Sequence, residues 1–367
     1  MSTEADIRFM REALTLAESM HGMTSPDPMV GAVIVNDGEL VGRGYHAQFA
    51  TPHAETFAIK NAGEKARFST LYVNLEPCCH HGNNPPCTSA IISAGISRVV
   101  AAIEDPNPLV SGKGFSELRA AGIKVDFGIL EEEAKQLNES FIKYITTNRP
   151  FVILKSAMSL DGKIATKTGD SFWITGMEAR KYVHQVRSHV DAVMVGIGTV
   201  LKDNPWLSVR DADIIRKNPY KIVLDGSAKI PLDSHILSFE PQNTIVVVTK
   251  SANAKKIGAI KKTGADVIVQ PTSKDIVDLD LLMIELGSRK ITSILLEGGG
   301  KISASAVSAE IVDKLMYIIS SKIIGGADAP TPIEGAGIEK LSQAINIRNV
   351  ITKRLGDDIL VEGYVMR

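Results

Sequence analysis

Residues 70–103 read TLYVNLEPCCHHGNNPPCTSAIISAGISRVVAAI, and this stretch decides the fold of the first part of the chain. The apolar run 70–75 predicts a strand, the segment from Pro86 predicts a helix, and the run 97–103 predicts a second strand. Proline suits a helix start because its missing N–H needs no partner there. Strand, loop, helix and strand in this order predict an α/β unit layered around one sheet.

The alternation extends in both directions from this stretch. The expected elements on the N-terminal side are a helix with Ile7, Met10, Leu14 and Ala17 on its core face, strands at 30–35 and 40–44 joined by the turn Asp37-Gly38, and a helix with Pro52 at its start. On the C-terminal side they are a helix over 111–121, a strand over 123–127 and one last helix over 131–146.

A polar segment, 146–150, ends in Pro150 and interrupts the pattern, so we place the domain boundary there. The first domain then spans 1–147 and the second 151–367. The chain's 367 residues are comfortable for two cores. Apolar strand candidates separated by helical stretches predict a second α/β domain, and these strands are 151–158, 191–195, 221–224, 244–248, 266–269, 293–297 and 314–319.

Composition excludes several classes of protein. The formal net charge is −1, which favours neither nucleic acid nor anionic lipid as a partner. The three cysteines, Cys78, Cys79 and Cys87, lie within ten residues of each other, so no disulfide framework is expected and a reducing compartment is indicated. We find no secretory signal and no apolar run near the roughly 18 residues of a membrane span, and we expect a cytoplasmic protein.

One group of residues in the first domain has the composition of a catalytic zinc site. His53, Cys78 and Cys87 offer one imidazole and two thiolates, and three ligands leave the fourth tetrahedral position open for water. Glu55 lies two residues after His53 and is placed to shuttle protons. The pattern matches the signature of zinc nucleobase deaminases, His-x-Glu followed by Pro-Cys-x-x-Cys, except that eight residues instead of two separate Cys78 from Cys87. Scattered polar residues near a tight turn, or a structural zinc site, are the alternatives, although structural sites usually have four protein ligands.

The second domain carries two glycine-rich turns that each follow a strand. Glu297-Gly298-Gly299-Gly300 precedes a helix, and Gly196-Ile197-Gly198-Thr199 is similar. Such turns let a backbone approach a pyrophosphate. Each turn alone is better explained as a plain strand-to-helix connection. Two of them in one domain favour a dinucleotide, although the ordinary Gly-x-Gly-x-x-Gly fingerprint is missing.

Several motifs together resemble one family, the bifunctional riboflavin-biosynthesis deaminase–reductases. In the first domain they are residues 27–31 (DPMVG), the loop 77–87 (PCCHHGNNPPC), 105–110 (DPNPLV) and 112–114 (GKG). In the second they are residues 155–165 (KSAMSLDGKIA), 173–175 (WIT), 196–200 (GIGTV) with 203–205 (DNP), and 324–330 (IGGADAP). The resemblance covers nearly the whole chain.

The resemblance implies a cytidine-deaminase-like three-layer α/β/α domain followed by a dihydrofolate-reductase-like α/β domain. The first hydrolyses an exocyclic amine of a diaminopyrimidinone that carries ribose 5-phosphate. The second reduces the ribosyl group to ribityl with NADPH. A homo-oligomer is also a family expectation.

For the deaminase, the resemblance implies that His53, Cys78 and Cys87 bind one Zn²⁺, that Glu55 moves protons, and that His46 and His80 line the substrate pocket. Two positions depart from the family pattern. Asp27 stands where Asn is usual and contacts the pyrimidine, and Asn83 stands where a Lys or Arg usually holds the phosphate.

For the reductase, the implied cofactor contacts are Ala157, Trp173, Thr199, Asp203, Gly299 and Gly300. The implied substrate contacts are Ser171, Arg187, Leu207, Arg210 and Glu297. Guanidinium groups suit phosphate, whereas a lone arginine is more often a solvated surface charge. Lys155 stands inside an otherwise apolar strand, and either an ion pair or substrate binding explains it.

Two further hypotheses compete with the bifunctional enzyme. The departures at Asp27 and Asn83 are consistent with a reductase whose zinc domain no longer deaminates. An RNA-binding or RNA-editing module shares the zinc signature, but the near-neutral charge and the second domain argue against it.

Overall fold

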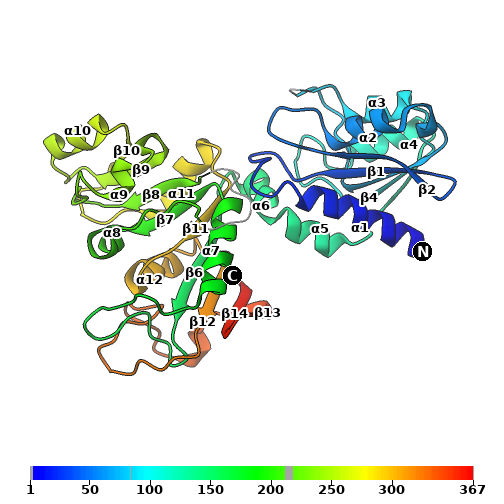
Figure 1. The fold of residues 1–367 in the computed structure, drawn as a ribbon. Coiled ribbons are helices and arrows are strands. Elements are labelled where there is room, and N and C mark those ends of the chain that lie inside the picture. Colours follow the sequence, from blue (N-terminus) through cyan, green and yellow to red (C-terminus); the bar gives the residue numbers. More distant parts are fainter. Residues whose placement is uncertain (1–2, 83, 211–217, 367) are drawn as a thin grey trace. The chain divides into compact units, whose positions relative to one another are not determined.

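The computed structural model describes residues 3–82, 84–210 and 218–366. The chain forms two compact units, residues 1–148 and 149–367. Each has its own sheet (Figure 1). Among the described residues, no helix has both the length and the apolar character that crossing a bilayer requires.

The first unit is built on a five-stranded sheet. Its strands, in spatial order, are β2 (Glu39–Tyr45), β1 (Gly31–Asn36), β3 (Thr70–Leu75), β4 (Arg98–Ile103) and β5 (Lys124–Phe127). Strand β1 pairs antiparallel with β2 and β3, and the rest of the sheet is parallel. One face carries α1 (Glu4–Glu18) and α5 (Glu131–Leu137); the other carries α2 (Ala54–Ala62), α3 (Cys87–Ser93) and α4 (Lys113–Ala120) (Figure 1). This confirms the predicted three-layer α/β/α domain.

Three local predictions in this unit were wrong. Ile7 is 38% exposed, because the buried face of α1 runs through Phe9, Met10 and Ala13. The neighbouring Asp6 is buried instead, and it forms an ion pair with Arg98. Pro52 lies outside α2, which begins at Ala54 after the N-cap His53.

The single helix expected over 131–146 is two helices, α5 and α6 (Glu139–Thr147). They break at Asn138, whose side chain accepts from the Met29 N–H (2.8 Å) and donates to the Met29 carbonyl (2.9 Å). These two hydrogen bonds to a neighbouring loop stabilise the break more than an uninterrupted helix would.

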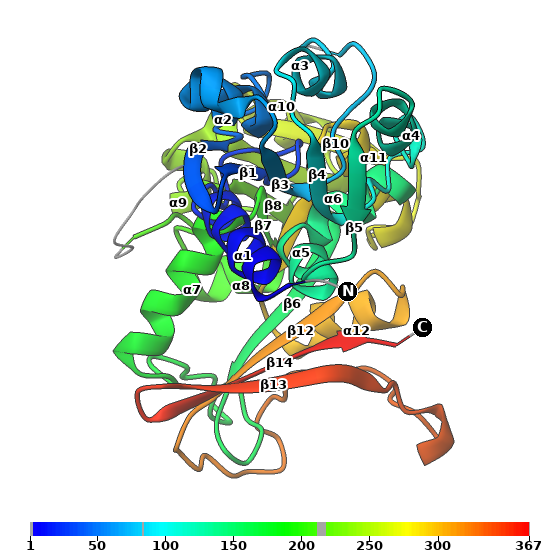
Figure 2. The ribbon, with the colours of Figure 1, turned by 90° about the vertical axis from the view of Figure 1, so that its right-hand side faces the viewer.

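The second unit is built on a nine-stranded sheet. The strand order is β10 (Asp266–Gln270), β9 (Thr244–Thr249), β8 (Tyr220–Leu224), β7 (Ala192–Gly196), β11 (Ser293–Leu296), β6 (Phe151–Met158), β12 (Lys314–Ile319), β14 (Asp358–Val365) and β13 (Ile347–Leu355). The sheet is parallel from β10 to β12, and β14 and β13 continue it antiparallel as a long hairpin at its edge (Figure 2).

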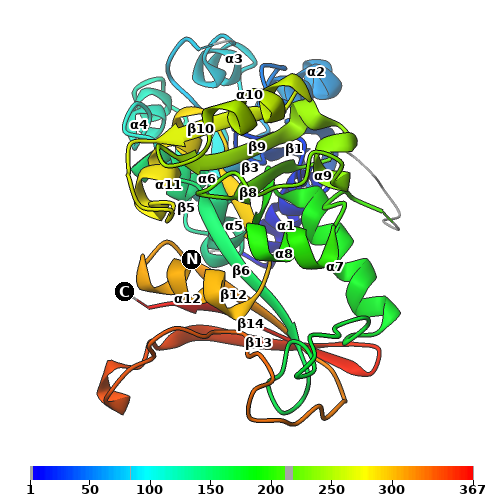
Figure 3. The ribbon, with the colours of Figure 1, turned by 90° about the vertical axis from the view of Figure 1, so that its left-hand side faces the viewer.

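Helices cover both faces of this sheet. One core contains residues of α7 (Met177–His189), α8 (Ile197–Asp203), α9 (His235–Ser238) and α10 (Ala254–Lys262). The opposite core contains residues of α11 (Leu279–Ser288) and α12 (Gly300–Ser308) (Figure 3). The predicted strands are all present within a residue or two, whereas the hairpin of β13 and β14 was not anticipated.

Candidate active site

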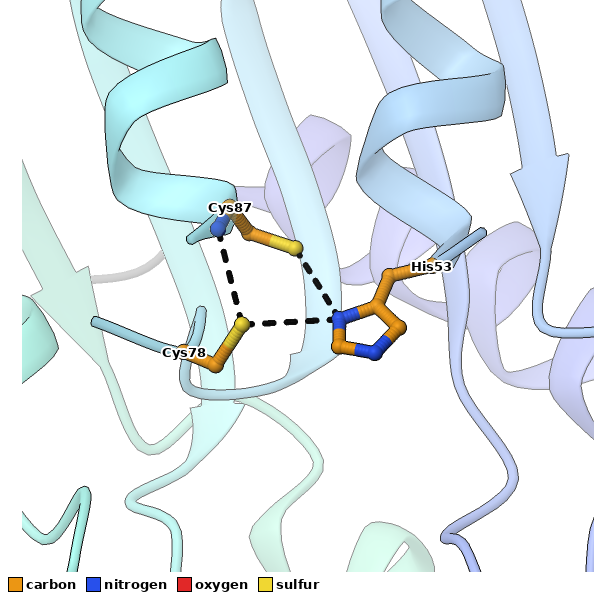
Figure 4. A group of neighbouring side chains, drawn as sticks. All are labelled: His53, Cys78 and Cys87. Atoms are coloured by element: carbon orange, nitrogen blue, oxygen red, sulfur yellow. Dashed lines mark hydrogen bonds between the residues drawn. The ribbon is translucent and has the colours of Figure 1, made fainter. Parts of the chain in front are cut away.

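Two helix starts and one loop bring the predicted zinc ligands together. His53 is the N-cap of α2, Cys87 is the first residue of α3, and Cys78 lies in the loop after β3. His53 Nδ1 is 3.2 Å from Cys87 Sγ and 3.4 Å from Cys78 Sγ, and the Cys87 N–H donates to Cys78 Sγ (3.4 Å) (Figure 4). All three ligand atoms lie within 4.8 Å of one another.

These atoms fit a tetrahedral metal. With Zn–N near 2.0–2.1 Å and Zn–S near 2.3 Å, tetrahedral angles separate a nitrogen from a sulfur ligand by about 3.5 Å. The two N–S separations are close to that value. Hydrogen bonding from Cys87 outweighs burial and, with His53, lowers the pKa of the Cys78 thiol below its usual range, so one thiolate forms readily. The donor set is therefore compatible with Zn²⁺.

Glu55 lies beside this cluster in the first turn of α2. It is only 3% exposed, and its Oε2 has no hydrogen-bond partner among the described residues. Burial raises the pKa of its carboxyl group, while the positive charge of His53 acts in the opposite direction. A buried carboxylate oxygen without a partner is costly unless a ligand uses it, so this atom is suited to proton transfer.

The cluster opens into a cavity of about 320 Å³. Four carboxylates line it: Asp27, Glu55, Glu76 and Asp105. Its other polar lining residues include His46, His80, Asn84 and Asn107. Burial raises the pKa of Asp105 to about 7, and the negative charges of Glu76 and Cys78 act in the same direction.

At position 27, where the family usually has Asn, the side chain of Asp27 contacts a buried histidine. His46 is buried, and its Nε2 lies 3.0 Å from Asp27 Oδ2, while its Nδ1 faces the Pro52 carbonyl at 3.4 Å. His80 also lines the cavity, and its buried Nδ1 has no partner among the described residues. The expectation for Asn83 falls outside the described residues.

The second unit gathers three of the predicted substrate residues. Arg187 of α7 donates two hydrogen bonds to Glu297, from Nε (2.7 Å) and from a terminal nitrogen (2.9 Å). Lys155 of β6 lies 3.6 Å from the same carboxylate. The structure therefore confirms the ion pair, one of the two explanations for Lys155, and substrate binding by Lys155 stays a prediction.

The glycine turns lie at the ends of β7 and β11, as predicted. A Cβ added to Gly198 or Gly299 would meet nothing within 4 Å, whereas one on Gly298 would lie 3.2 Å from Thr199 Oγ1. Gly299 is the N-cap of α12, and Gly300 begins that helix. Open space beside backbone N–H groups at a helix start fits a pyrophosphate.

The other predicted reductase residues differ in their exposure. Trp173 is 60% exposed beneath the Arg180 guanidinium, and Ala157, Ser171 and Asp203 are half-buried. Arg210 is exposed. Leu207 packs in the core against the α7 side of the sheet, so only its backbone is available to a substrate.

Family models match both units. The RibD C-terminal domain matches residues 150–361, and the cytidine and deoxycytidylate deaminase zinc-binding region matches residues 3–103. The riboflavin biosynthesis protein RibD of Actinobacillus pleuropneumoniae is 43% identical over 364 residues, 99% of this chain and 96% of the relative. The chain belongs to the RibD family of riboflavin-biosynthesis proteins.

Solved structures agree with this family assignment. RibD of Acinetobacter baumannii superposes with a TM-score of 0.89 at 34% identity, and each chain is covered to 99%. A diaminohydroxyphosphoribosylaminopyrimidine deaminase/5-amino-6-(5-phosphoribosylamino)uracil reductase of Thermotoga maritima gives 0.82 at 37% identity, again with 99% of each chain covered. The family therefore combines a deaminase and a reductase domain in one enzyme, and the predicted fold classes are confirmed. No finding favours the alternative of a reductase alone.

Sequence reasoning missed part of the site. Glu76, Asp105 and Asn107 line the cavity, yet none was predicted as a site residue. The signal for Glu76 was present, because an acidic residue at the end of an apolar strand needs a partner once buried. Its partners come from residues about 30–40 positions further along the chain, so spacing alone could not reveal them.

Proposed function

We propose that residues 1–147 are a zinc-dependent deaminase and residues 151–367 an NADPH-dependent reductase. Their substrate is 2,5-diamino-6-(5-phosphoribosylamino)pyrimidin-4-one, which is first deaminated and then reduced from the ribosyl to the ribityl compound. The observation that carries the proposal is the cluster of His53, Cys78 and Cys87, which meets the cavity at His53 and Cys78, where Glu55 also lines it.

In the first reaction, water replaces an exocyclic amine of the pyrimidine and ammonia leaves. His53 Nδ1 and the two cysteine sulfurs would hold one Zn²⁺. When bound, zinc supplies the Lewis acid that makes water a nucleophile near neutral pH. Glu55 Oε2 takes a proton from the attacking water and passes it to the departing nitrogen. His46, Asp27 and His80 line the same cavity, where they would border the ring.

In the second reaction, the sugar gains one hydride and one proton. NADPH, when bound, supplies the hydride. The open space at Gly198 and Gly299 supports a pyrophosphate site there. Five further contacts to the cofactor are proposed: Gly300, which follows Gly299 at the start of α12, and Ala157, Trp173, Thr199 and Asp203.

Charged groups orient the substrate of the reductase. Lys155, Arg187 and Glu297 form one buried cluster whose guanidinium and ammonium groups suit a phosphorylated sugar. Ser171, Arg210 and the backbone of Leu207 complete the proposed substrate contacts. We also propose a cytoplasmic homo-oligomer that binds no nucleic acid, which sedimentation of the purified protein and cell fractionation would test.

The decisive experiment measures ammonia release from the diaminopyrimidinone ribosyl phosphate by zinc-loaded full-length protein without NADPH. Glu55→Gln should lower the rate on the order of 10²- to 10⁴-fold, because it removes the proton carrier while zinc stays bound. Glu64→Gln, an exposed glutamate after the same helix, is the matched control and should keep the wild-type rate. Wild-type protein that is folded and zinc-loaded but releases no ammonia would refute the deaminase.

A further inference from the structure

Glu76 is a buried carboxylate for which neither proposed reaction supplies a role. It directly follows β3, precedes the Pro77-Cys78 pair, and is 3% exposed. Its Oε2 accepts hydrogen bonds from the N–H of Asp105 (3.1 Å) and of Gly112 (2.9 Å), and its Oε1 accepts one from the N–H of Phe115 (3.0 Å). Three backbone donors therefore converge on one side chain.

Two of these donors belong to the start of helix α4. Gly112 is its N-cap and Phe115 lies in its first turn, where N–H groups lack partners within the helix. An anion is favoured at that end by the helix dipole. Helix α4 also packs closely against the loop after β3, because a Cβ on Gly114 would lie 2.1 Å from the Pro77 carbonyl oxygen. Glu76 thus joins α4 to the loop that carries Cys78.

The third donor links Glu76 to the cavity wall. Asp105 donates its N–H to Glu76, and its own Oδ1 accepts from the N–H of Asn107 (2.9 Å). Asp105 and Asn107 both line the cavity, as does Cys78, two residues after Glu76. A continuous set of hydrogen bonds and peptide bonds therefore links the proposed metal ligand Cys78 to Asp105 and Asn107 in the cavity lining.

We propose that Glu76 is a positioning residue for the deaminase: it holds the Asp105–Asn107 wall in register with the metal ligand Cys78. This inference rests on the proposed deaminase function. Glu76 acts on the shape of the substrate cavity through backbone groups, and the zinc ligands themselves do not depend on it. Its loss therefore weakens substrate binding while zinc remains bound.

The side chain must be a carboxylate to serve three donors. Glutamine keeps the length but has one acceptor oxygen, and its NH₂ group would face a backbone N–H. At least one buried donor would then lose its partner. Aspartate keeps the charge but is one methylene shorter, so it should reach only part of the set.

The test compares zinc-loaded full-length wild type, Glu76→Gln and Glu104→Gln. Glu104 is the matched control, because it is exposed on the loop that carries Asp105 and Asn107 and accepts only from Ser111 Oγ in the described structure. Glu76→Gln should raise the KM for ammonia release by roughly tenfold or more, with kcat within about threefold. Equimolar zinc and NADPH-dependent reduction should be unchanged.

Amide hydrogen exchange supplies a readout independent of turnover. In Glu76→Gln, peptides covering 104–115 should exchange faster than in the wild type and in Glu104→Gln, while the rest of the first unit keeps its protection. If Glu76→Gln does not fold, Glu76→Asp carries the test, with a smaller rise in KM.

Two results would overturn the inference. A lower melting temperature with an unchanged KM would make Glu76 a residue of stability alone, and loss of zinc would place its role at the metal ligands. Absence of ammonia release from the wild type refutes the proposed deaminase instead, and with it the role assigned to Glu76. No Glu76 variant can produce that last result, so the two failures are distinguishable.

Discussion

Replacing Glu297 by glutamine should destabilise the second unit, because two buried cations would lose their negatively charged partner. Arg187 and Lys155 both face this carboxylate, and the three side chains are only 11–15% exposed. Burial alone would raise the pKa of Glu297, but the charges of Arg187 and Lys155 outweigh it and lower the pKa to about 2 from an ordinary 4.5. That difference corresponds to about 3 kcal/mol, within the range of about 3–5 kcal/mol for breaking a buried pair.

The effect should depend on pH with a defined sign. Because the folded pKa is lower than the unfolded one, the stabilisation is complete above about pH 4.5 and is lost as the pH falls towards 2. The difference between wild type and Glu297→Gln should therefore be largest at pH 7 and shrink below pH 4.5.

Tryptophan fluorescence during urea unfolding isolates this unit, because both tryptophans, Trp173 and Trp206, lie in it. With a typical slope near 2 kcal/mol/M, a loss of about 3 kcal/mol shifts the midpoint by about 1.5 M. Glu285→Gln is the control, since its exposed i,i+4 pair with Arg289 should contribute under about 1 kcal/mol. A midpoint shift for Glu297→Gln no larger than that control, or equal at pH 7 and pH 2.5, would refute the reasoning.

Three further predictions concern the first unit. Asn138→Ala should lower its unfolding free energy by about 2 kcal/mol, because both hydrogen bonds to Met29 are lost; no loss in calorimetry would contradict this. Asp27→Asn should lower the KM for deamination by about tenfold, because an amide beside His46 can donate as well as accept; an unchanged KM in steady-state kinetics would show that this departure is tolerated. Phenanthroline should stop ammonia release and lower the melting temperature of this unit while NADPH oxidation by the reductase continues; ammonia release that survives verified zinc removal would refute the metal site.

Much of the candidate site could be predicted from the sequence, because its signals are local and chemically specific. His53 and Glu55 share one helix start, and Cys78 and Cys87 flank one loop, so these residue types together indicate ligands and a proton carrier before any fold is known. The central strands were found for a similar reason. Strands buried on both faces read as unbroken apolar runs.

The hairpin of β13 and β14 gave no such signal. β13 is exposed along nearly its whole length, so no apolar pattern marks it, and its backbone pairing with β14 holds it in the sheet. Leu207 is the opposite case: it was an expected substrate contact, but its side chain packs in the core.

The sequence by itself determined the chemistry of this protein: an imidazole with a carboxylate two residues after it, two thiolates, and glycine turns at strand ends. Only the tertiary structure decided how that chemistry is held. The side-chain interactions of Asn138, Asp27 and Glu76 join segments that lie 19 to 109 positions apart. A buried polar group must find its partner wherever the fold brings one, and that requirement acts through space and leaves no periodic trace along the chain.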